Sequence, residues 1–236
     1  MEDKADLRWP DADSGSWVGA MADTVLLDVD GTLVDSNYWH TAAWQQAFAE
    51  VERWQPSWRI HARIGMGGDR LVAAVAGDEV EQRLGETLRK RWKELYDELL
   101  PNVRALPGSA ELIGELKRRG LKVVLASSGK PDHLEHARSL LGVDELLDGV
   151  TTGDDVESTK PAGDLFALAL DRAGGRDGVV IGDTPWDAKA ATDVGMQAIG
   201  LRCGGFSGGH LRAAGAIAVL DDPADVIEHI HHTPLV

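Results

Sequence analysis

The sequence is poor in cysteine, in basic residues and in long apolar runs. Its single cysteine, Cys203, cannot form an internal disulfide, which favours a reducing compartment. No apolar run approaches the roughly 20 residues that a membrane-spanning helix needs. The first residues, MEDKADLRWPDADSG, are acidic and lack the apolar segment of a signal peptide. These absences predict a cytoplasmic protein that has no membrane as a partner.

Acidic residues outnumber basic ones, with 39 Asp and Glu against 24 Lys and Arg and a net charge of −15. A field of this sign repels nucleic acid, so we expect no nucleic-acid partner. It also repels a phosphorylated substrate unless the binding site supplies its own cations. With 236 residues, 43% of them hydrophobic, the chain can bury one large core and a small accessory domain. These features do not specify the oligomeric state.

Short apolar runs that end in polar residues recur along the chain. The first is TVLLDVD at 24–30, and similar runs occupy 122–128, 178–183, 196–201 and 216–220. Amphipathic helical stretches separate most of them, and alternating strands and helices predict an α/β fold with a doubly wound parallel sheet. Ligands bind beyond the carboxyl ends of the strands in such sheets.

One stretch interrupts this alternation. Residues 37–105 show helical patterns and no buried strand, which predicts a helical cap domain inserted after the first strand. We therefore expect an N-terminal tail over 1–22 and an α/β core formed by 23–36 and 106–236. Met21 is a candidate internal start. We expect the five tryptophans of the insert to pack mainly between its helices.

The run DVDGT at 28–32 places two carboxylates at the end of the first strand. Asp28 and Asp30 are two residues apart, so their side chains point to the same side. Adjacent carboxylates repel one another unless a cation or a shared proton lies between them. Gly31 permits a sharp turn, and its N–H, with that of Thr32, is predicted to face a bound anion.

Further polar residues follow the other predicted strands. Ser127 and Ser128 precede a helix that begins near Pro131, and hydroxyl and N–H groups at a helix N-terminus can hold a phosphate. Lys160 precedes Pro161, which we place in the first turn of another helix. A lone lysine at such a place is more often a solvated surface charge. Asp183 and Asp187, in GDTPWD, provide the oxygen ligands that suit Mg²⁺.

This ordered set resembles the four motifs of the haloacid dehalogenase superfamily over residues 24 to about 220. The run KPAGDLFALAL is similar to the lysine motif of the branch that holds phosphoglycolate phosphatase and β-phosphoglucomutase, which carries a helical cap. The resemblance implies that Asp28 is a nucleophile and that Asp30 is a general acid and base. Ser127 and Lys160 would bind the transferring phosphoryl group. The metal ligands would be Asp28, Asp30 (through its carbonyl), Asp183 and Asp187, the last directly or through water.

Substrate selection is expected to depend on the cap. The loop IGMGGDR at 64–70 is rich in glycine, so Gly67 could approach a ligand closely, and Arg63 or Arg70 could bind a carboxylate or second phosphate. An ordinary helix–helix turn explains the loop equally well. His40 resembles a residue at the cap entrance of the sugar-phosphate mutases.

Three functions therefore stay open. The favoured one is an Mg²⁺-dependent phosphatase for a small phosphorylated metabolite. The second is a phosphomutase, and the third is a non-catalytic phosphate-binding protein, against which the intact set of motif residues argues.

Overall fold

The computed structural model describes residues 21–156 and 158–235, so most of the predicted tail, 1–20, lies outside the described residues. Six parallel strands form one sheet in the order β3-β2-β1-β4-β5-β6. Their bounds are β1 Thr24–Leu27, β2 Lys122–Ala126, β3 Gly149–Thr151, β4 Gly178–Gly182, β5 Gln197–Leu201 and β6 Ala216–Leu220. The predicted α/β class with a parallel sheet is confirmed.

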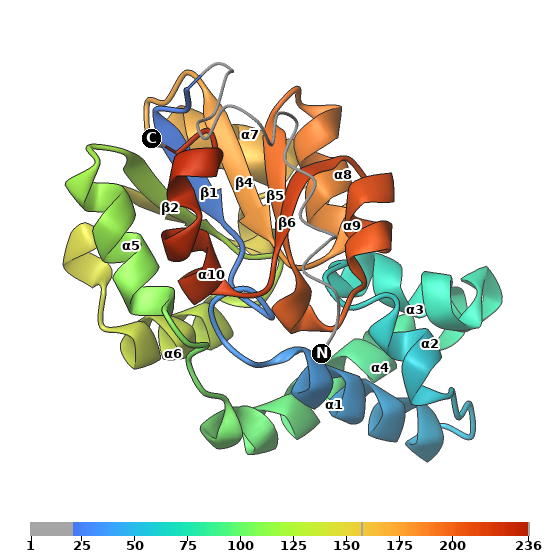
Figure 1. Cartoon of the computed structure of the whole chain (residues 1–236). Helices are drawn as coiled ribbons and strands as arrows, with labels where there is room; N and C mark the ends of the chain where they lie inside the picture. The colour runs from blue at the N-terminus through green and yellow to red at the C-terminus, as the bar shows by residue number, and fades with distance from the viewer. Residues whose placement is uncertain (1–20, 157, 236) are drawn as a thin grey trace, which may run out of the picture.

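Helices cover both faces of the sheet (Figure 1). After their first residues, the central strands β1 and β2 are apolar, with Val25 and Leu27 packing in one hydrophobic cluster and Leu26 in another. A strand that is buried on both faces has this composition. The first cluster includes residues of α5 (Ser109–Arg118), α6 (Pro131–Leu141) and α10 (Pro223–Glu228). The second includes residues of α7 (Asp164–Arg172), α8 (Pro185–Asp193) and α9 (Gly208–Ala213).

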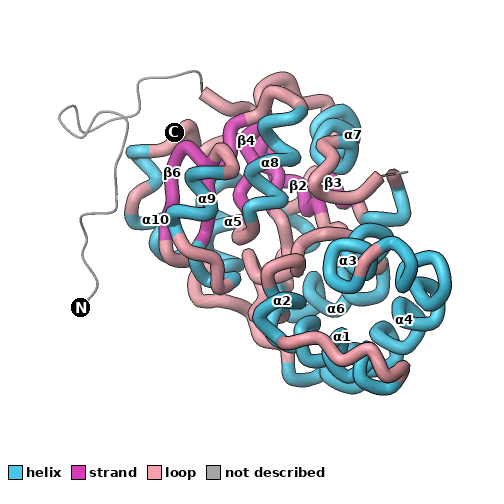
Figure 2. Tube along the Cα trace, turned by 90° about the vertical axis from the view of Figure 1, so that its right-hand side faces the viewer, coloured by secondary structure: helices cyan, strands magenta, loops and turns pink. Residues whose placement is uncertain are grey.

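Four further helices lie beyond the carboxyl ends of the strands (Figure 2). They are α1 (Asn37–Glu50), α2 (Ser57–His61), α3 (Gly68–Ala76) and α4 (Asp78–Leu99). Trp44 and Trp92 stack between α1 and α4, with ring centroids 5.0 Å apart. Trp54 and Trp58 are 63% and 72% exposed, so the expected packing role is wrong for these two.

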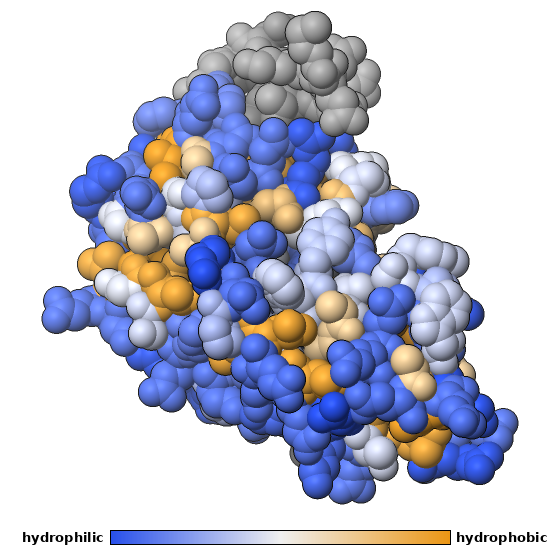
Figure 3. Space-filling view, turned by 90° about the horizontal axis from the view of Figure 1, so that it is seen from below, coloured by the Kyte–Doolittle hydropathy of each residue, from blue (hydrophilic) through white to orange (hydrophobic). Residues whose placement is uncertain are grey.

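Short 3-10 helices fill several connections: η2 Leu100–Asn102, η3 Asp144–Leu146, η4 Gly153–Asp155, η5 Arg202–Gly204 and η6 Ile230–His232. The edge strand β3 was not predicted from the sequence, because three residues are too few to show a periodic pattern. Hydrophilic residues cover most of the face seen in Figure 3, with smaller groups of hydrophobic residues between them. Within the described part of the chain, no helix is both long enough and apolar enough to cross a membrane.

Candidate active site

The chain turns sharply directly after β1. Gly31 has φ +78°, and a Cβ at this position would lie 2.3 Å from Asn37 Nδ2, so the turn needs glycine. The N–H of Gly31 donates to Val34 O at 2.8 Å, and that of Thr32 to Val29 O at 3.3 Å. The prediction that these two N–H groups face an anion is therefore wrong, because the turn itself uses them.

The carboxylate of Asp28 lies at the bottom of this turn and is 5% exposed. The Thr32 hydroxyl donates to Asp183 Oδ1 at 2.9 Å and lies 3.2 Å from Asp28 Oδ2, so it stands between the two acids. Asn37, the first residue of α1, donates through Nδ2 to Asp183 Oδ2 at 2.7 Å. These contacts fix both carboxylates at the carboxyl ends of β1 and β4.

Lys160 is the cation of the site and is 1% exposed. Its ammonium group contacts Asp28 Oδ1 and lies 2.7 Å from Asp187 Oδ1. Burial disfavours the charged form, but Asp187 and Asp28 more than offset this effect and hold the pKa of Lys160 above its usual range. The more common alternative, a solvated surface lysine, does not describe this residue.

The helix that follows Lys160 starts later than predicted. Pro161 was expected in its first turn, but α7 begins at Asp164. The residues between form a turn in which the N–H of Ala162 donates to Thr159 O at 3.1 Å. This turn directs the lysine side chain into the core, away from solvent.

Asp187 is fixed by the start of α8. Thr184 caps the helix and, through both its N–H and its hydroxyl, donates to Asp187 Oδ2, at 3.0 and 2.6 Å. This capping box leaves Asp187 Oδ1 to face Lys160.

Asp28, Asp183 and Asp187 could hold a divalent cation. One carboxylate oxygen from each lies within 4.8 Å of the others, and all three residues are buried. Burial raises the pKa of Asp28 to about 7, with Lys160 opposing the shift and Asp187 adding to it. Burial, together with Asp28 and Asp187, raises the pKa of Asp183 well above its usual range. When ionised, the three acids carry more negative charge than the one lysine can balance, so the site has room for a further cation. Oxygen ligands of this kind fit Mg²⁺.

Asp30 has different neighbours from Asp28. Its Oδ1 accepts a hydrogen bond from Ser36 Oγ at 2.7 Å and lies 3.1 Å from His40 Nε2. Ser127 Oγ lies 3.4 Å from its Oδ2. Burial raises the pKa of Asp30, but His40 and the hydrogen bond from Ser36 outweigh burial and hold that pKa well below its usual range. The carboxyl group is thus ionised in this arrangement.

The two serines that follow β2 have different surroundings. Ser127 is 1% exposed, and its hydroxyl accepts the N–H of Gly129 at 2.9 Å. Ser128 Oγ is buried and has no partner within the described residues. Since α6 begins at Pro131, both lie at its N-terminal end, as predicted.

A cavity of about 60 Å³, here called the inner cavity, is lined by Asp28, Asp30 and His40 and by residues of the cap loop. Of the candidate substrate residues in the cap, only His40 lines it.

The other candidates lie elsewhere. Arg63 lies over the Trp186 ring at 5.8 Å, and Arg70 is exposed beside Asp69. A Cβ on Gly67 would lie 2.1 Å from Thr159 Oγ1, so this glycine permits the close approach of the two segments.

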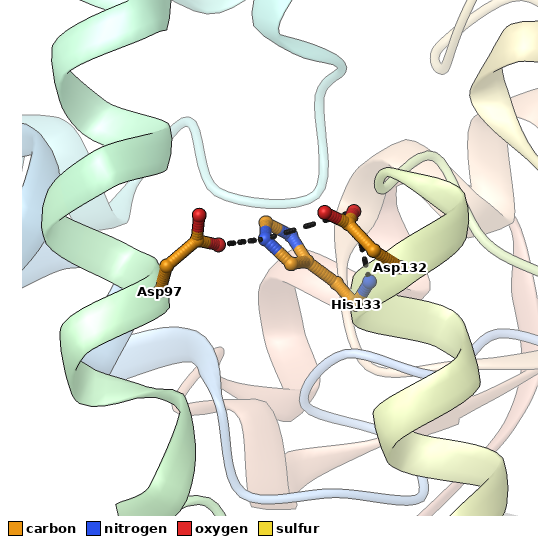
Figure 4. A group of neighbouring side chains, drawn as sticks. All are labelled: Asp97, Asp132 and His133. Carbon is orange, nitrogen blue, oxygen red and sulfur yellow. Dashed lines mark hydrogen bonds and ion pairs between the residues drawn. The ribbon is translucent and has the colours of Figure 1, made fainter.

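A second group of polar side chains joins α4 to α6 (Figure 4). His133 Nε2 lies 2.8 Å from Asp97 Oδ1, and Asp132 lies beside it. The three could hold a metal ion by geometry, but Lys93 Nζ already lies 2.9 Å from Asp97 and 2.7 Å from Asp132. The cluster is therefore an ion-paired contact between the helices, in which Lys93 bridges the two acids.

Several site residues were missed by the sequence analysis. The capping pattern T-x-x-D at 184–187 was visible and could have identified Thr184. Asn37 has no such signal, because its partner Asp183 is 146 residues away. The N–H groups of Val29 and Asp30, directly after β1, have no acceptor among the described residues, unlike those of Gly31 and Thr32.

Comparisons with known proteins agree with this geometry. A family described as haloacid dehalogenase-like hydrolase matches residues 22–195. A probable phosphatase, IndB, from Dickeya dadantii is 27% identical over 89% of this chain and 94% of its own. A phosphoglycolate phosphatase from Synechococcus elongatus is 27% identical over 87% of this chain and 96% of its own. The crystal structure of a hydrolase from Pseudomonas syringae superposes with a TM-score of 0.83 at 34% identity, covering 88% of this chain and 97% of that one.

Proposed function

The chain belongs to the haloacid dehalogenase-like hydrolases and is a phosphatase, and we propose that it hydrolyses a small phosphorylated metabolite in a magnesium-dependent reaction at Asp28. One observation carries the proposal. Three buried carboxylates converge within 4.8 Å of one another, and a single buried lysine opposes them. Such a site needs a further cation, and it suits an anionic substrate only once that cation is bound.

The chemistry follows from the positions of the side chains. A carboxylate oxygen of Asp28 attacks phosphorus, a bond between this oxygen and phosphorus forms, and the bond from phosphorus to the leaving oxygen breaks. Lys160 and Ser127 hold the transferring phosphoryl oxygens. Asp28, Asp183, the carbonyl of Asp30 and, directly or through water, Asp187 would hold an Mg²⁺ ion, which would supply charge that offsets the repulsion between nucleophile and phosphate.

Asp30 transfers the protons in both steps. Its ionised form suits the second step, in which it takes a proton from the water that attacks the aspartyl-phosphate and releases phosphate. In the first step the leaving oxygen needs a proton. The contact between Asp30 and His40 Nε2, at 3.1 Å, lets the pair share one proton and deliver it through Asp30. His40 thus becomes part of the proposed acid.

The helices α1–α4 would exclude bulk water during this reaction. We keep the division into a cap over 37–105 and a core over 23–36 and 106–236 as part of the proposal, because α1–α4 pack on one another and lie beyond the carboxyl end of β1 (Figure 1). Two contacts support a closed cap. His61 Nε2 lies 3.0 Å from Gly204 O, and the Thr159 hydroxyl donates to Asp69. Hydrolysis is favoured over isomerisation because the sequence relatives named above are phosphatases. The single cysteine supports a cytoplasmic location.

Phosphate release tests the function directly. We expect turnover of p-nitrophenyl phosphate and of members of a metabolite panel in Mg²⁺, and its loss after chelation with EDTA. Calcium should inhibit, because its larger and looser coordination shell misplaces the nucleophile. Full activity after exhaustive chelation would refute the metal assignment, and the absence of phosphate release from every ester would refute the phosphatase.

A further inference from the structure

A larger cavity adjoins the inner one. It measures about 470 Å³, lies between α4 and the core, and is here called the outer cavity. The two cavities share Gly68, Trp92, Ser128 and Gly129 as lining residues. The inner cavity, at about 60 Å³, has room for only a few water-sized groups. A phosphate ester seated at Asp28 would therefore extend its leaving group past Trp92 into the outer cavity.

Four cationic side chains line the outer cavity: Arg89, Lys90, Lys93 and Lys130. Three are already paired with carboxylates. Arg89 donates to both oxygens of Glu81, Lys93 lies between Asp97 and Asp132, and Lys130 pairs with Asp154 at 3.0 Å.

Lys90 is exposed, and among residues 21–156 and 158–235 no carboxylate lies within ion-pairing distance of it. Lys90 is thus the cation that a ligand could use.

The carboxylates that line the same cavity are Asp69, Glu86 and Asp154. Asp154 is paired with Lys130, and Asp69 lies 3.8 Å from Arg70 Nε and also accepts a hydrogen bond from the Thr159 hydroxyl. Glu86, one helical turn before Lys90, has no ion-pair partner within the described part of the chain. The free charges of the cavity are therefore one cation and one anion, which should affect a charged ligand in opposite directions.

We propose that the outer cavity binds a second anionic group, a carboxylate or a phosphate, on the leaving group of the substrate, and that Lys90 determines this specificity. The inference rests on the proposed phosphatase function. A chain of net charge −15 repels such a substrate unless a local cation compensates. Arg63 and Arg70, expected to serve this purpose, line neither cavity. Lys90 takes the role that the sequence had assigned to them.

Matched substrates test the proposal. 3-Phosphoglycerate and glycerol 3-phosphate differ in one terminal carboxylate, and fructose 1,6-bisphosphate and fructose 6-phosphate differ in one phosphate. We expect the wild type to have a higher kcat/KM for the more anionic member of at least one pair. A preference within the first pair indicates that a carboxylate is bound, and a preference within the second indicates a phosphate. In Lys90→Met this preference should fall about five- to tenfold, through a raised KM for the anionic substrate.

Two further variants sharpen the result. Glu86→Gln should raise the same preference about twofold, because it removes a repelling charge from the cavity. Lys189→Met is the matched control. Lys189 is also an exposed helical lysine that has no ion-pair partner in the described residues, but it lies on α8 and lines neither cavity. It should leave the preference unchanged.

The inference and the function can fail separately. The inference is wrong if Asp28-dependent turnover shows no preference for the anionic substrates, or if Lys90→Met leaves that preference unchanged. Either result is compatible with the phosphatase function. The proposed function is wrong if the wild type shows no Asp28-dependent turnover of any substrate, p-nitrophenyl phosphate included. In that case calorimetric binding of 3-phosphoglycerate and fructose 1,6-bisphosphate to wild type and Lys90→Met still decides the inference: equal affinity in both proteins for both ligands contradicts it.

Discussion

The acid site and the cap differ in how their side chains are held. At the acid site, Asp28, Asp183, Asp187 and Lys160 are at most 5% exposed. Lys160 contacts Asp28 and Asp187, and Asp183 accepts hydrogen bonds from Thr32 and Asn37. On the cap, Lys90 and Glu86 face a cavity without ion-pair partners among the described residues. Buried charges are fixed by their partners, whereas the cap residues are free to meet a ligand. We therefore assign the proposed chemistry to the buried acid site and the proposed choice of substrate to the exposed residues of the outer cavity.

The largest effect is expected at the acid site. Asp28→Asn is nearly isosteric, but an amide is a poor nucleophile and a poor metal ligand, so turnover should fall by roughly four orders of magnitude or more. Lys160 keeps its contact with Asp187 in this variant, so the fold should persist. Phosphate release and circular dichroism measure the two properties. A variant that retains more than about a tenth of the wild-type rate would place the nucleophile elsewhere.

Lys160→Met tests whether the acid site is also a source of stability. Removing the cation leaves Asp28 and Asp187 buried without a counter-charge, which should cost about 3–5 kcal/mol in the free energy of unfolding. Added Mg²⁺ should recover part of this loss, because it replaces the missing charge. Urea denaturation with and without Mg²⁺ measures both. Lys189→Met, the surface control, should leave stability unchanged, and equal midpoints for the two variants would contradict the account.

The smallest effect is expected where α4 meets α6, at His133. Burial lowers its pKa, and the hydrogen bond to Asp97 only partly opposes this; His40 adds to the lowering, and Asp132 and Asp30 oppose it. Between this lowered value and the unfolded value of 6.5, the unfolded chain binds a proton that the folded chain does not. Stability should therefore fall as the pH drops through 6.5, and less steeply in His133→Gln.

Proton NMR of the His133 ring measures its pKa in the folded protein, and thermal melts across this pH range measure the stability. Lys93 and the acids around His133 remain in both proteins, so their own titration is common to the comparison. A His133 ring that titrates at or above 6.5 would contradict the assigned direction.

The same contrast explains what the sequence could and could not predict. Asp28, Asp30, Ser127 and Asp183 follow strands whose apolar composition is visible, and parallel strands bring their carboxyl ends together. The family resemblance added Lys160, which no local pattern would have buried. The turn at 161–163, the N–H partners of Gly31 and Thr32, and the contact between Asn37 and Asp183 depend on packing between distant segments. Lys90 was missed because a free surface lysine has no signal in a sequence until the cavity is known.

In the proposed reaction Asp28 carries the phosphoryl group, and chemical trapping of the aspartyl-phosphate identifies the residue that does so. Borohydride reduces an aspartyl-phosphate to homoserine, so enzyme quenched with borohydride during steady turnover, then digested and examined by mass spectrometry, reports which carboxylate was phosphorylated. Asp28→Asn, treated identically, is the control. The account predicts homoserine at position 28 in the wild type and none in the variant. Homoserine at position 30 or 183, or unmodified peptides during proven turnover, would contradict it.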